Sequence, residues 1–185
     1  MPSRSYIRKE RKMLDLIKSR YSEKNYSDRE VPADLLEQII EAGVFAPSGR
    51  NRQAVRFMVV QDKDTIKFLS KLNARVGGFP EGTDPFYNAP VVVAVFADRE
   101  VSTHIEDGSL ALGNMLNVAF SLGVGSCWIH RAKEMFETDE GRAVAREYGI
   151  PDSYIGVGNC TLGYGAEGGT RAPKVRVQGR VHYKK

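Results

Sequence analysis

The run APVVVAVFA, residues 89–97, constrains the fold of this chain more than any other segment. Successive side chains of a strand point to opposite faces, and here both sets are apolar, so a strand in this run is buried on both faces. Pro90 lies at its start, where a strand tolerates a residue without an N–H group. We therefore predict a buried strand over residues 90–98 in a layered α+β domain. The run is too short to cross a membrane, which requires about 20 apolar residues.

Hydrophobic periodicity predicts the other elements. Pro32 suits the first turn of a helix that ends at Val44. Thr103 with Glu106 fits a capping box for a long helix that ends before Gly123. The last residues are expected to form an extended arm. The predicted helices span residues 5–18, 32–44, 63–76, 103–122 and 139–149, and the predicted strands span residues 55–61, 90–98, 124–130 and 154–164.

The chain has 185 residues, of which 42% are hydrophobic and 27% charged, which is typical of one globular domain. We expect residues 1–185 to form a single domain with a basic N-terminal helix and an extended C-terminal arm. The N-terminal residues include no apolar signal-peptide core. Cys127 and Cys160 form no C-x-x-C motif, so neither a disulfide framework nor a zinc site is indicated. A cytoplasmic protein without a membrane anchor is expected.

The net charge of +4 is distributed unevenly along the chain. Residues 1–12 carry +4, residues 171–185 carry +6, and the residues between them carry −6. A nucleic-acid-binding domain more often has a basic face on its folded body, so the high proportion of basic residues is weak evidence for that class. A basic end of the chain that closes over a phosphate group explains the pattern more simply.

Familiar catalytic and metal-binding motifs are absent or out of context. Residues 163–168 match G-x-G-x-x-G, but Pro173 follows, so the helix that this dinucleotide motif requires is not expected. His104, His130 and His182 lack the spacing of metal ligands. Cys127 and His130 lie on one predicted strand, where their side chains need not meet. We therefore predict no catalytic side chain and no metal ion.

The segment RYSEKN, residues 20–25, is a first candidate for a binding site. Arg20, Ser22 and Lys24 alternate, so in an extended segment their side chains point to one side. Two cations and a hydroxyl group would suit a phosphate and a polyol chain. A solvated linker between two helices is the alternative interpretation.

The loop APSGRNRQ, residues 46–53, is a second and stronger candidate. Ser48, Asn51 and Gln53 carry hydroxyl and amide groups that both donate and accept hydrogen bonds, which suggests a planar polar ligand. A capped turn is the alternative, and it accounts for at most two of the three side chains.

In their order along the chain, these segments resemble the FMN-dependent nitroreductase family. The pattern R-x-S-x-K is followed by the block PADLLEQIIEAGVFAPSGRNRQ, then by SLGVGSCWI and a late LGYG, and together they cover nearly the whole chain. The most specific part is APSGxNxQ. The resemblance implies an α+β sandwich with a central mixed, mainly antiparallel sheet flanked by helices. It also implies an intertwined homodimer with one FMN at each end of the subunit interface.

The resemblance assigns FMN contacts to particular residues. Counterparts of the first candidate segment hold the phosphate and the ribityl chain, and counterparts of the loop contact the flavin, partly from the opposite subunit. Asn73 matches a position at the pyrimidine edge. Arg171, Lys174 and Arg176 compete to complete the phosphate site. The predicted FMN-binding residues are Arg20, Tyr21, Ser22, Lys24, Pro47, Ser48, Asn51, Gln53, Asn73, Cys127, Trp128, Ile129, Gly163, Lys174 and Arg176.

The implied activity follows from the cofactor. FMN takes a hydride from NADH or NADPH and passes reducing equivalents to a second acceptor, which explains why no nucleophile or general base is evident. If donor and acceptor use the same ring face in turn, ping-pong kinetics follow, with a nitroaromatic, quinone or similar small acceptor. A flavin-binding protein without reductase turnover is the alternative. The sequence distinguishes neither NADH from NADPH nor the physiological acceptor.

Residues 75–90, RVGGFPEGTDPFYNAP, are the candidate for substrate selection. They are rich in Gly and Pro and carry three aromatic side chains, as a lid or a pocket wall often does. Aromatic residues that anchor a surface loop are an equally good explanation. If Arg50 faces the pocket, it favours anionic acceptors or a reduced anionic flavin, whereas Arg52 is expected to be a surface charge.

Overall fold

The computed structural model describes residues 13–168 and 172–184. Within them, four strands form one sheet in the order β1-β2-β4-β3. All neighbouring strands of this sheet run antiparallel. The expected mixed sheet therefore contains no parallel pair among the described residues. The strands are β1 (Val55–Val60), β2 (Val91–Asp98), β3 (Gly125–Ile129) and β4 (Tyr154–Gly163).

The antiparallel pairing of β1 with β2 results from the path of the connection between them. The helix α3 (Lys63–Gly77) leads away from the end of β1, and residues 78–90 return alongside it. Val60, at the end of β1, consequently pairs with Val92, near the start of β2. A connection that leaves one strand and enters its neighbour at the same end of the sheet makes the two strands antiparallel.

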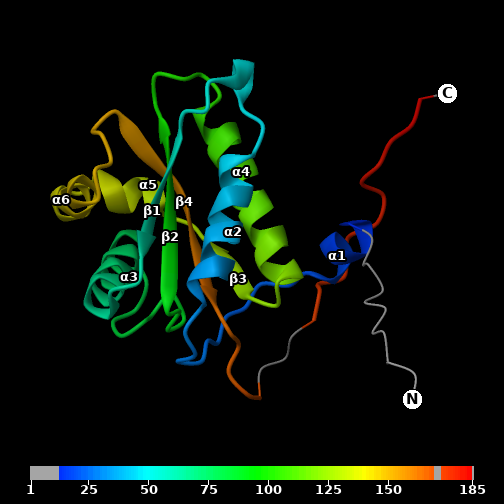
Figure 1. The fold of residues 1–185 in the computed structure, drawn as a ribbon, viewed down its shortest axis with the longest axis horizontal. Coiled ribbons are helices and arrows are strands. Elements are labelled where there is room, and N and C mark those ends of the chain that lie inside the picture. Colours follow the sequence, from blue (N-terminus) through cyan, green and yellow to red (C-terminus); the bar gives the residue numbers. More distant parts are fainter. Residues whose placement is uncertain (1–12, 169–171, 185) are drawn as a thin grey trace, which may run out of the picture.

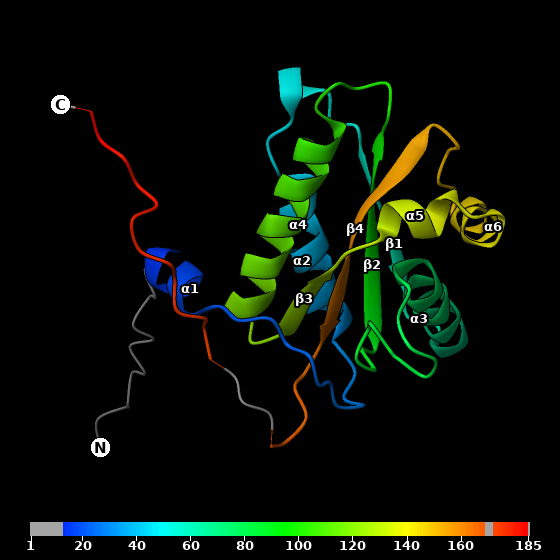
Figure 2. The ribbon, with the colours of Figure 1, turned by 180° about the vertical axis from the view of Figure 1, so that it is seen from behind.

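β2 and β4 form the centre of the sheet. Every residue of β4 is buried, as is every residue of β2 except Asp98. The predicted strand over residues 90–98, buried on both faces, is thus confirmed. Helices α2 (Ala33–Val44) and α4 (His104–Ser121) cover one face, and α3, α5 (Ala132–Glu137) and α6 (Asp139–Glu147) cover the other (Figures 1 and 2). The predicted α+β sandwich is confirmed.

Two predictions about helices are wrong. The hydroxyl of Thr103 makes no capping bond to the backbone of α4 but donates to the carboxylate of Asp107 at 3.1 Å, so the expected capping box with Glu106 is absent. α5 was not expected, although the buried residues Met135 and Phe136 mark its inner face. Thr138 separates α5 from α6, because its hydroxyl accepts the N–H of Gly141.

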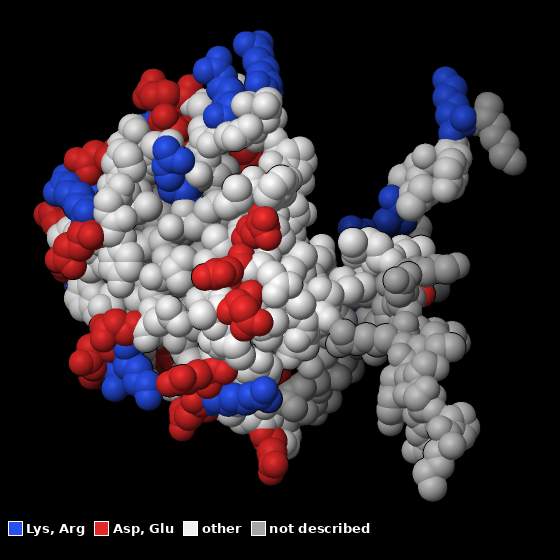
Figure 3. All heavy atoms as spheres, viewed as in Figure 1, with Lys and Arg blue, Asp and Glu red and all other residues white. Residues whose placement is uncertain are grey.

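Both ends of the described chain extend away from the body (Figures 1 and 2). α1 (Met13–Ser19) buries none of its residues, and the remainder of the predicted first helix, residues 5–12, lies outside the described residues. The C-terminal arm, residues 172–184, carries basic side chains that stand apart from the body, where acidic side chains are scattered (Figure 3). Among the described helices, none has the length and apolar character needed to span a bilayer.

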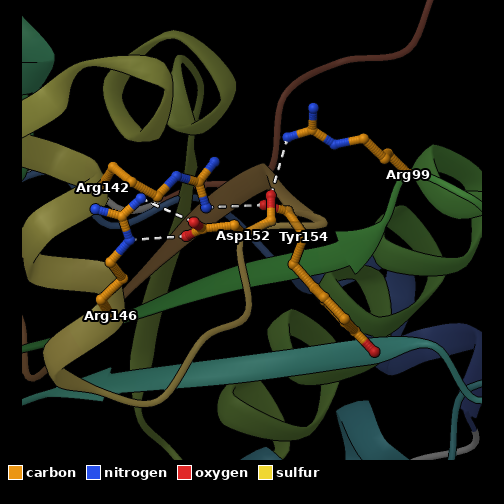
Figure 4. Close-up of polar contacts among 5 residues, drawn as sticks. All are labelled: Arg99, Arg142, Arg146, Asp152 and Tyr154. Carbon is orange, nitrogen blue, oxygen red and sulfur yellow. Dashed lines mark hydrogen bonds and ion pairs between the residues drawn. The ribbon is translucent and has the colours of Figure 1, made fainter.

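Arginine side chains hold the loop that leads into β4 (Figure 4). Arg99 donates to the carbonyl of Ser153 at 3.2 Å, and Arg142 donates to the carbonyl of Tyr154 at 3.1 Å. The guanidinium of Arg146 forms two bonds of 2.8 Å with the carboxylate of Asp152. Hydrogen bonding and charge from Arg146 lower the pKa of Asp152 below its ordinary value.

We expect Asp152→Asn to lower the Tm by about 1–3 °C at pH 7, with the difference narrowing below about pH 4. The pKa of Asp152 is depressed in the folded state, so its carboxylate stabilises the fold above the unfolded-state pKa. This contribution is lost as the pH falls through the folded-state pKa. Thermal unfolding between pH 3 and pH 7 measures the effect, with Glu147→Gln as the control for an exposed carboxylate. A Tm difference that stays constant across this range would contradict the prediction.

Candidate functional site

A hollow of about 490 Å³ lies where the two ends of the described chain approach each other. Residues 20–25 line it from one side, and Ala172, Lys174 and Arg176 of the C-terminal arm line it from the other. Four of these residues are cations, and one, Glu23, is a carboxylate. We call this feature the basic hollow. It brings together Arg20, Ser22 and Lys24 with two of the three competing residues near the C-terminus, while Arg171 lies outside the described residues.

Glu23 shapes the N-terminal wall of the basic hollow. Its side chain is buried, and its carboxylate accepts the N–H groups of Lys24 at 3.0 Å and Asn25 at 3.1 Å. Its own N–H donates to the carbonyl of Ser126 on β3. Residues 20–24 thus lie beside the sheet without joining a strand, with a turn after Glu23. Sequence reasoning missed this residue, because an acidic side chain next to Lys24 in a polar segment gave no sign that it would be buried.

Two further contacts fix the same segment. Tyr26 is buried, and its hydroxyl lies 2.9 Å from the hydroxyl of Thr161 on β4. Burial raises the pKa of Tyr26, so its hydroxyl stays protonated at neutral pH. The Nζ of Lys24 lies 5.7 Å from the ring centroid of Tyr87, within the range of a cation–π contact.

The predicted residues of β3 lie at the edge of the sheet beside the basic hollow. Burial raises the pKa of Cys127, while the Ser22 hydroxyl and the charges of Lys24 and Arg20 act against that shift. The thiol is therefore protonated at neutral pH, and a nucleophilic role is not supported. The Trp128 ring packs on Gly158, where an added Cβ would lie 2.7 Å from Nε1. Ile129 is buried.

The loop of residues 46–53 is held in an uncommon backbone conformation. Arg50, Asn51 and Gln53 have φ angles of 52°, 56° and 52°, in the left-handed region that costs residues with a Cβ about 1–2 kcal/mol each. The hydroxyl of Ser48 accepts the N–H of Gln53 at 3.0 Å, and the amide of Gln53 donates to Asn51 Oδ1 at 3.0 Å. The capped turn therefore explains Ser48. The side-chain amides of Asn51 and Gln53 are exposed and hydrogen-bond to each other. Strain of this kind is common at binding sites.

Asp107 of α4 ties this loop to the body. Its side chain is buried, and its carboxylate accepts the N–H of Gly49 at 2.9 Å and the hydroxyl of Thr103 at 3.1 Å. Sequence reasoning missed its role, because an acidic residue in the first turn of a helix is ordinary. Arg50 and Arg52 are both exposed, and the side chain of Pro47 is also exposed.

Within one chain, the loop of residues 46–53 and the basic hollow do not meet. The loop follows the end of α2, and residues 20–25 lie near its other end (Figure 1). A helix of 12 residues rises about 18 Å, and the two predicted clusters lie towards opposite ends of α2.

Asn73 and Gly163 lie outside the basic hollow. Asn73 is buried, its amide donates to the carbonyl of His130 at 2.9 Å, and its Oδ1 has no partner among the described residues. Asn159 pairs with Ile129 in the sheet and also has a buried, unpartnered side-chain amide within that part of the chain. Gly163 is required for packing, because a Cβ there would lie 2.6 Å from Pro90 Cδ.

The arrangement suits anion binding rather than covalent catalysis. The cations and the Ser22 hydroxyl of the basic hollow match the oxygen atoms of a phosphate group. Within the described residues, no cluster of three or more His, Cys, Asp or Glu side chains is arranged to hold a metal ion. The exposed amides of the loop add donors and acceptors for the edge of a planar ligand.

Comparison with known proteins identifies the family. The sequence profile of the nitroreductase family matches residues 17–164, and this chain belongs to that family. It is 30% identical over 166 residues to a candidate NADH dehydrogenase/NAD(P)H nitroreductase of Methanothermobacter thermautotrophicus, covering 86% of this chain and 81% of that protein. A protein of the same description from Archaeoglobus fulgidus is 31% identical over 157 residues, covering 82% and 84%.

The fold matches a solved member of the family. The crystal structure of a nitroreductase with bound FMN from Bacteroides fragilis superposes with a TM-score of 0.88 at 29% identity, covering 95% of this chain and 100% of that chain. The residues of this chain fit such a ligand, because the basic hollow suits its phosphate, and the exposed loop amides and the unpartnered Asn73 Oδ1 suit a flat heterocycle.

We expect Asp107→Ala to destabilise the protein by about 1–3 kcal/mol. The substitution leaves two partly buried donors, the N–H of Gly49 and the hydroxyl of Thr103, without an acceptor. The adjacent exposed residue offers a matched control, and Glu106→Ala should change the free energy of unfolding by less than about 0.5 kcal/mol. Urea unfolding measures both variants, and hydrogen exchange at the Gly49 amide reports on the loop. Equal stability and equal exchange in the two variants would disprove the role of Asp107.

Proposed function

We propose that this protein is an FMN-dependent oxidoreductase that uses NADH or NADPH to reduce a small acceptor such as a nitroaromatic compound or a quinone. The observation that carries the proposal is the basic hollow, in which both ends of the described chain place cations around one space. The family and the FMN bound to the Bacteroides fragilis relative support the choice of ligand. The free thiols of Cys127 and Cys160 support a cytoplasmic location.

In this proposal, the FMN phosphate occupies the basic hollow. Arg20 and Arg176 offer planar guanidinium groups, and Lys24 and Lys174 act as point charges. The Ser22 hydroxyl is placed for the ribityl chain. Arg20 also donates to the carbonyl of Tyr21 at 3.0 Å, which limits the directions its guanidinium can take. Lys174 and Arg176 are assigned to the phosphate because they line the same hollow as Arg20 and Lys24.

The remaining predicted residues would hold and orient the flavin ring. When bound, FMN supplies the chemistry by taking a hydride from NAD(P)H and passing reducing equivalents to the acceptor. The edge strand β3 offers backbone groups of Cys127, Trp128 and Ile129 to the ring. No side chain of this chain has to act as nucleophile or base. If donor and acceptor use the same binding site in turn, ping-pong kinetics follow.

The proposed active unit is a homodimer, with the loop of residues 46–53 reaching the flavin held by the partner. The separation of this loop from the basic hollow within one chain supports this arrangement. Exposed apolar side chains on α1 and the C-terminal arm also support it, since a second copy would cover them. They are Met13, Leu14, Ile17, Val175, Val177, Val181 and Tyr183.

We expect the freshly purified protein to be yellow, to bleach when NADH or NADPH is added without oxygen, and to recover colour when a nitroaromatic or quinone is added. Arg176→Ala should weaken FMN binding by about tenfold, whereas Arg180→Ala, on the same arm but outside the hollow, should change it less than about twofold. Fluorescence titration with FMN measures both. Failure to bind FMN would refute the proposal, and FMN binding without bleaching would favour a flavin-binding protein without turnover.

We expect complementation between two defective variants to reveal a site shared by two chains. Arg20→Ala/Lys24→Ala damages the hollow, and Asn51→Ala/Gln53→Ala damages the loop. After unfolding and refolding together in equal amounts, heterodimers should contain one intact site of two, restoring about one quarter of wild-type FMN binding. Each variant refolded alone is the control. Absence of recovery, or a wild-type mass that stays at 20.6 kDa in sedimentation, would contradict the shared site.

A further inference from the structure

A second and larger cavity lies on the other side of the molecule from α4. It has a volume of about 850 Å³ and lies, partly open to solvent, between α3 and the returning segment of residues 78–90. This volume falls within the range of about 300–1,000 Å³ that is usual for small-molecule sites. Of the three aromatic residues of the segment 75–90, Phe79 lines this cavity, while Phe86 and Tyr87 anchor the segment to the core.

Several contacts hold this segment in place. Gly78 ends α3 with a φ of 66°, which turns the chain back along the helix. The carboxylate of Asp84 accepts the hydroxyl of Ser70 on α3 and the N–H groups of Phe86 and Asn88. The Phe86 side chain is completely buried in the core. The cavity is therefore formed before any ligand enters.

The α3 side of the cavity carries a row of cations. Lys63, Lys67 and Lys71 line it at intervals of four residues, which places them about 6 Å apart along the helix. None of these three side chains has an ion pair or hydrogen bond with another described residue. Like charges at this spacing destabilise a helix, and an anion between them removes that cost. Arg75 continues the row but is paired with Glu140 at 2.8 Å.

The opposite side of the cavity has different chemistry. Phe79, Pro80 and Pro90 offer flat apolar surfaces. Asp28 and Glu81 add carboxylates, which accept hydrogen bonds and repel anions. A ligand that suits both sides carries negative charge at one end and hydrogen-bond donors on a flat body.

We propose that this cavity binds a nucleotide, with its phosphate groups against Lys63, Lys67 and Lys71 and its base and ribose against the wall of residues 78–90. Phosphates meet the unpaired ammonium groups, the base stacks on the apolar surfaces, and its amino group and the ribose hydroxyls donate to Asp28 and Glu81. A simple aromatic acid fits less well, because it has no donors for these carboxylates. The nucleotide is either the adenylate half of NAD(P)H, which rests on the proposed function, or a free adenine nucleotide.

Calorimetric titration with ADP and with adenosine 2′,5′-bisphosphate tests the site directly on the FMN-loaded protein. We expect saturable binding that Lys67→Glu/Lys71→Glu weakens by about tenfold or more, while Lys133→Glu, an exposed lysine on α5, changes it less than about twofold. Lys67→Gln/Lys71→Gln provides a neutral variant that also relieves repulsion along α3, so its Tm should not fall. No saturable binding, or equal affinity in all variants, would overturn the proposal.

Competition with NADPH identifies the source of the nucleotide. If the probes compete with NADPH, and Lys67→Glu/Lys71→Glu raises the KM for NADPH but not for the acceptor, the cavity holds the adenylate half of the donor. If the probes bind without competing, it holds a free nucleotide. Both outcomes support the site. FMN content, measured in the same samples, stays at the wild-type level in either case, so failure of this proposal is distinguishable from failure of FMN binding.

Discussion

The pairing of β2 with β4 is the interaction on which the rest of the structure depends. Both strands are buried along almost their whole length, so their backbone groups can find partners only in each other and in β1 and β3. Apolar side chains on both faces then require helices on both sides of the sheet. Little room for polar groups remains inside, and chemistry is confined to the edge strand, the loops and the two ends of the chain. The basic hollow and the loop of residues 46–53 lie there.

Three carboxylates organise these peripheral regions in the same way. Glu23 accepts two N–H groups of the basic hollow, Asp107 holds the loop of residues 46–53, and Asp84 fixes the wall of the larger cavity. Taking a carboxylate out of water is costly, and the hydrogen bonds that each one accepts offset that cost. Each of them thereby converts a flexible connection into a defined surface. The strained loop at Arg50 depends on such support, because its backbone conformation is unfavourable by itself.

Local patterns predicted those features whose causes are local. The buried strand β2 and the helices α2, α3 and α4 follow from runs of apolar residues that extend over several turns or along a whole strand. α5 was missed because its six residues are too few for a clear periodicity. The capping box at Thr103 was wrong because Asp107, held in place by Gly49 from a distant part of the chain, competes for its hydroxyl. The antiparallel direction of β1 and β2 depends on the path of residues 78–90, and no residue pattern reports that path.

By itself, the sequence determined the layered α+β architecture and the residue types available for binding a phosphate and a flat polar ligand, because hydrophobic pattern and side-chain chemistry are properties of short segments. Only the tertiary structure decided that the arm joins residues 20–25 in one hollow, that the loop of residues 46–53 lies far from this hollow, and that three lysines of α3 line one cavity. These relations join residues far apart in the chain. They arise from how helices pack on a sheet, which depends on the shape of the whole core rather than on any single segment.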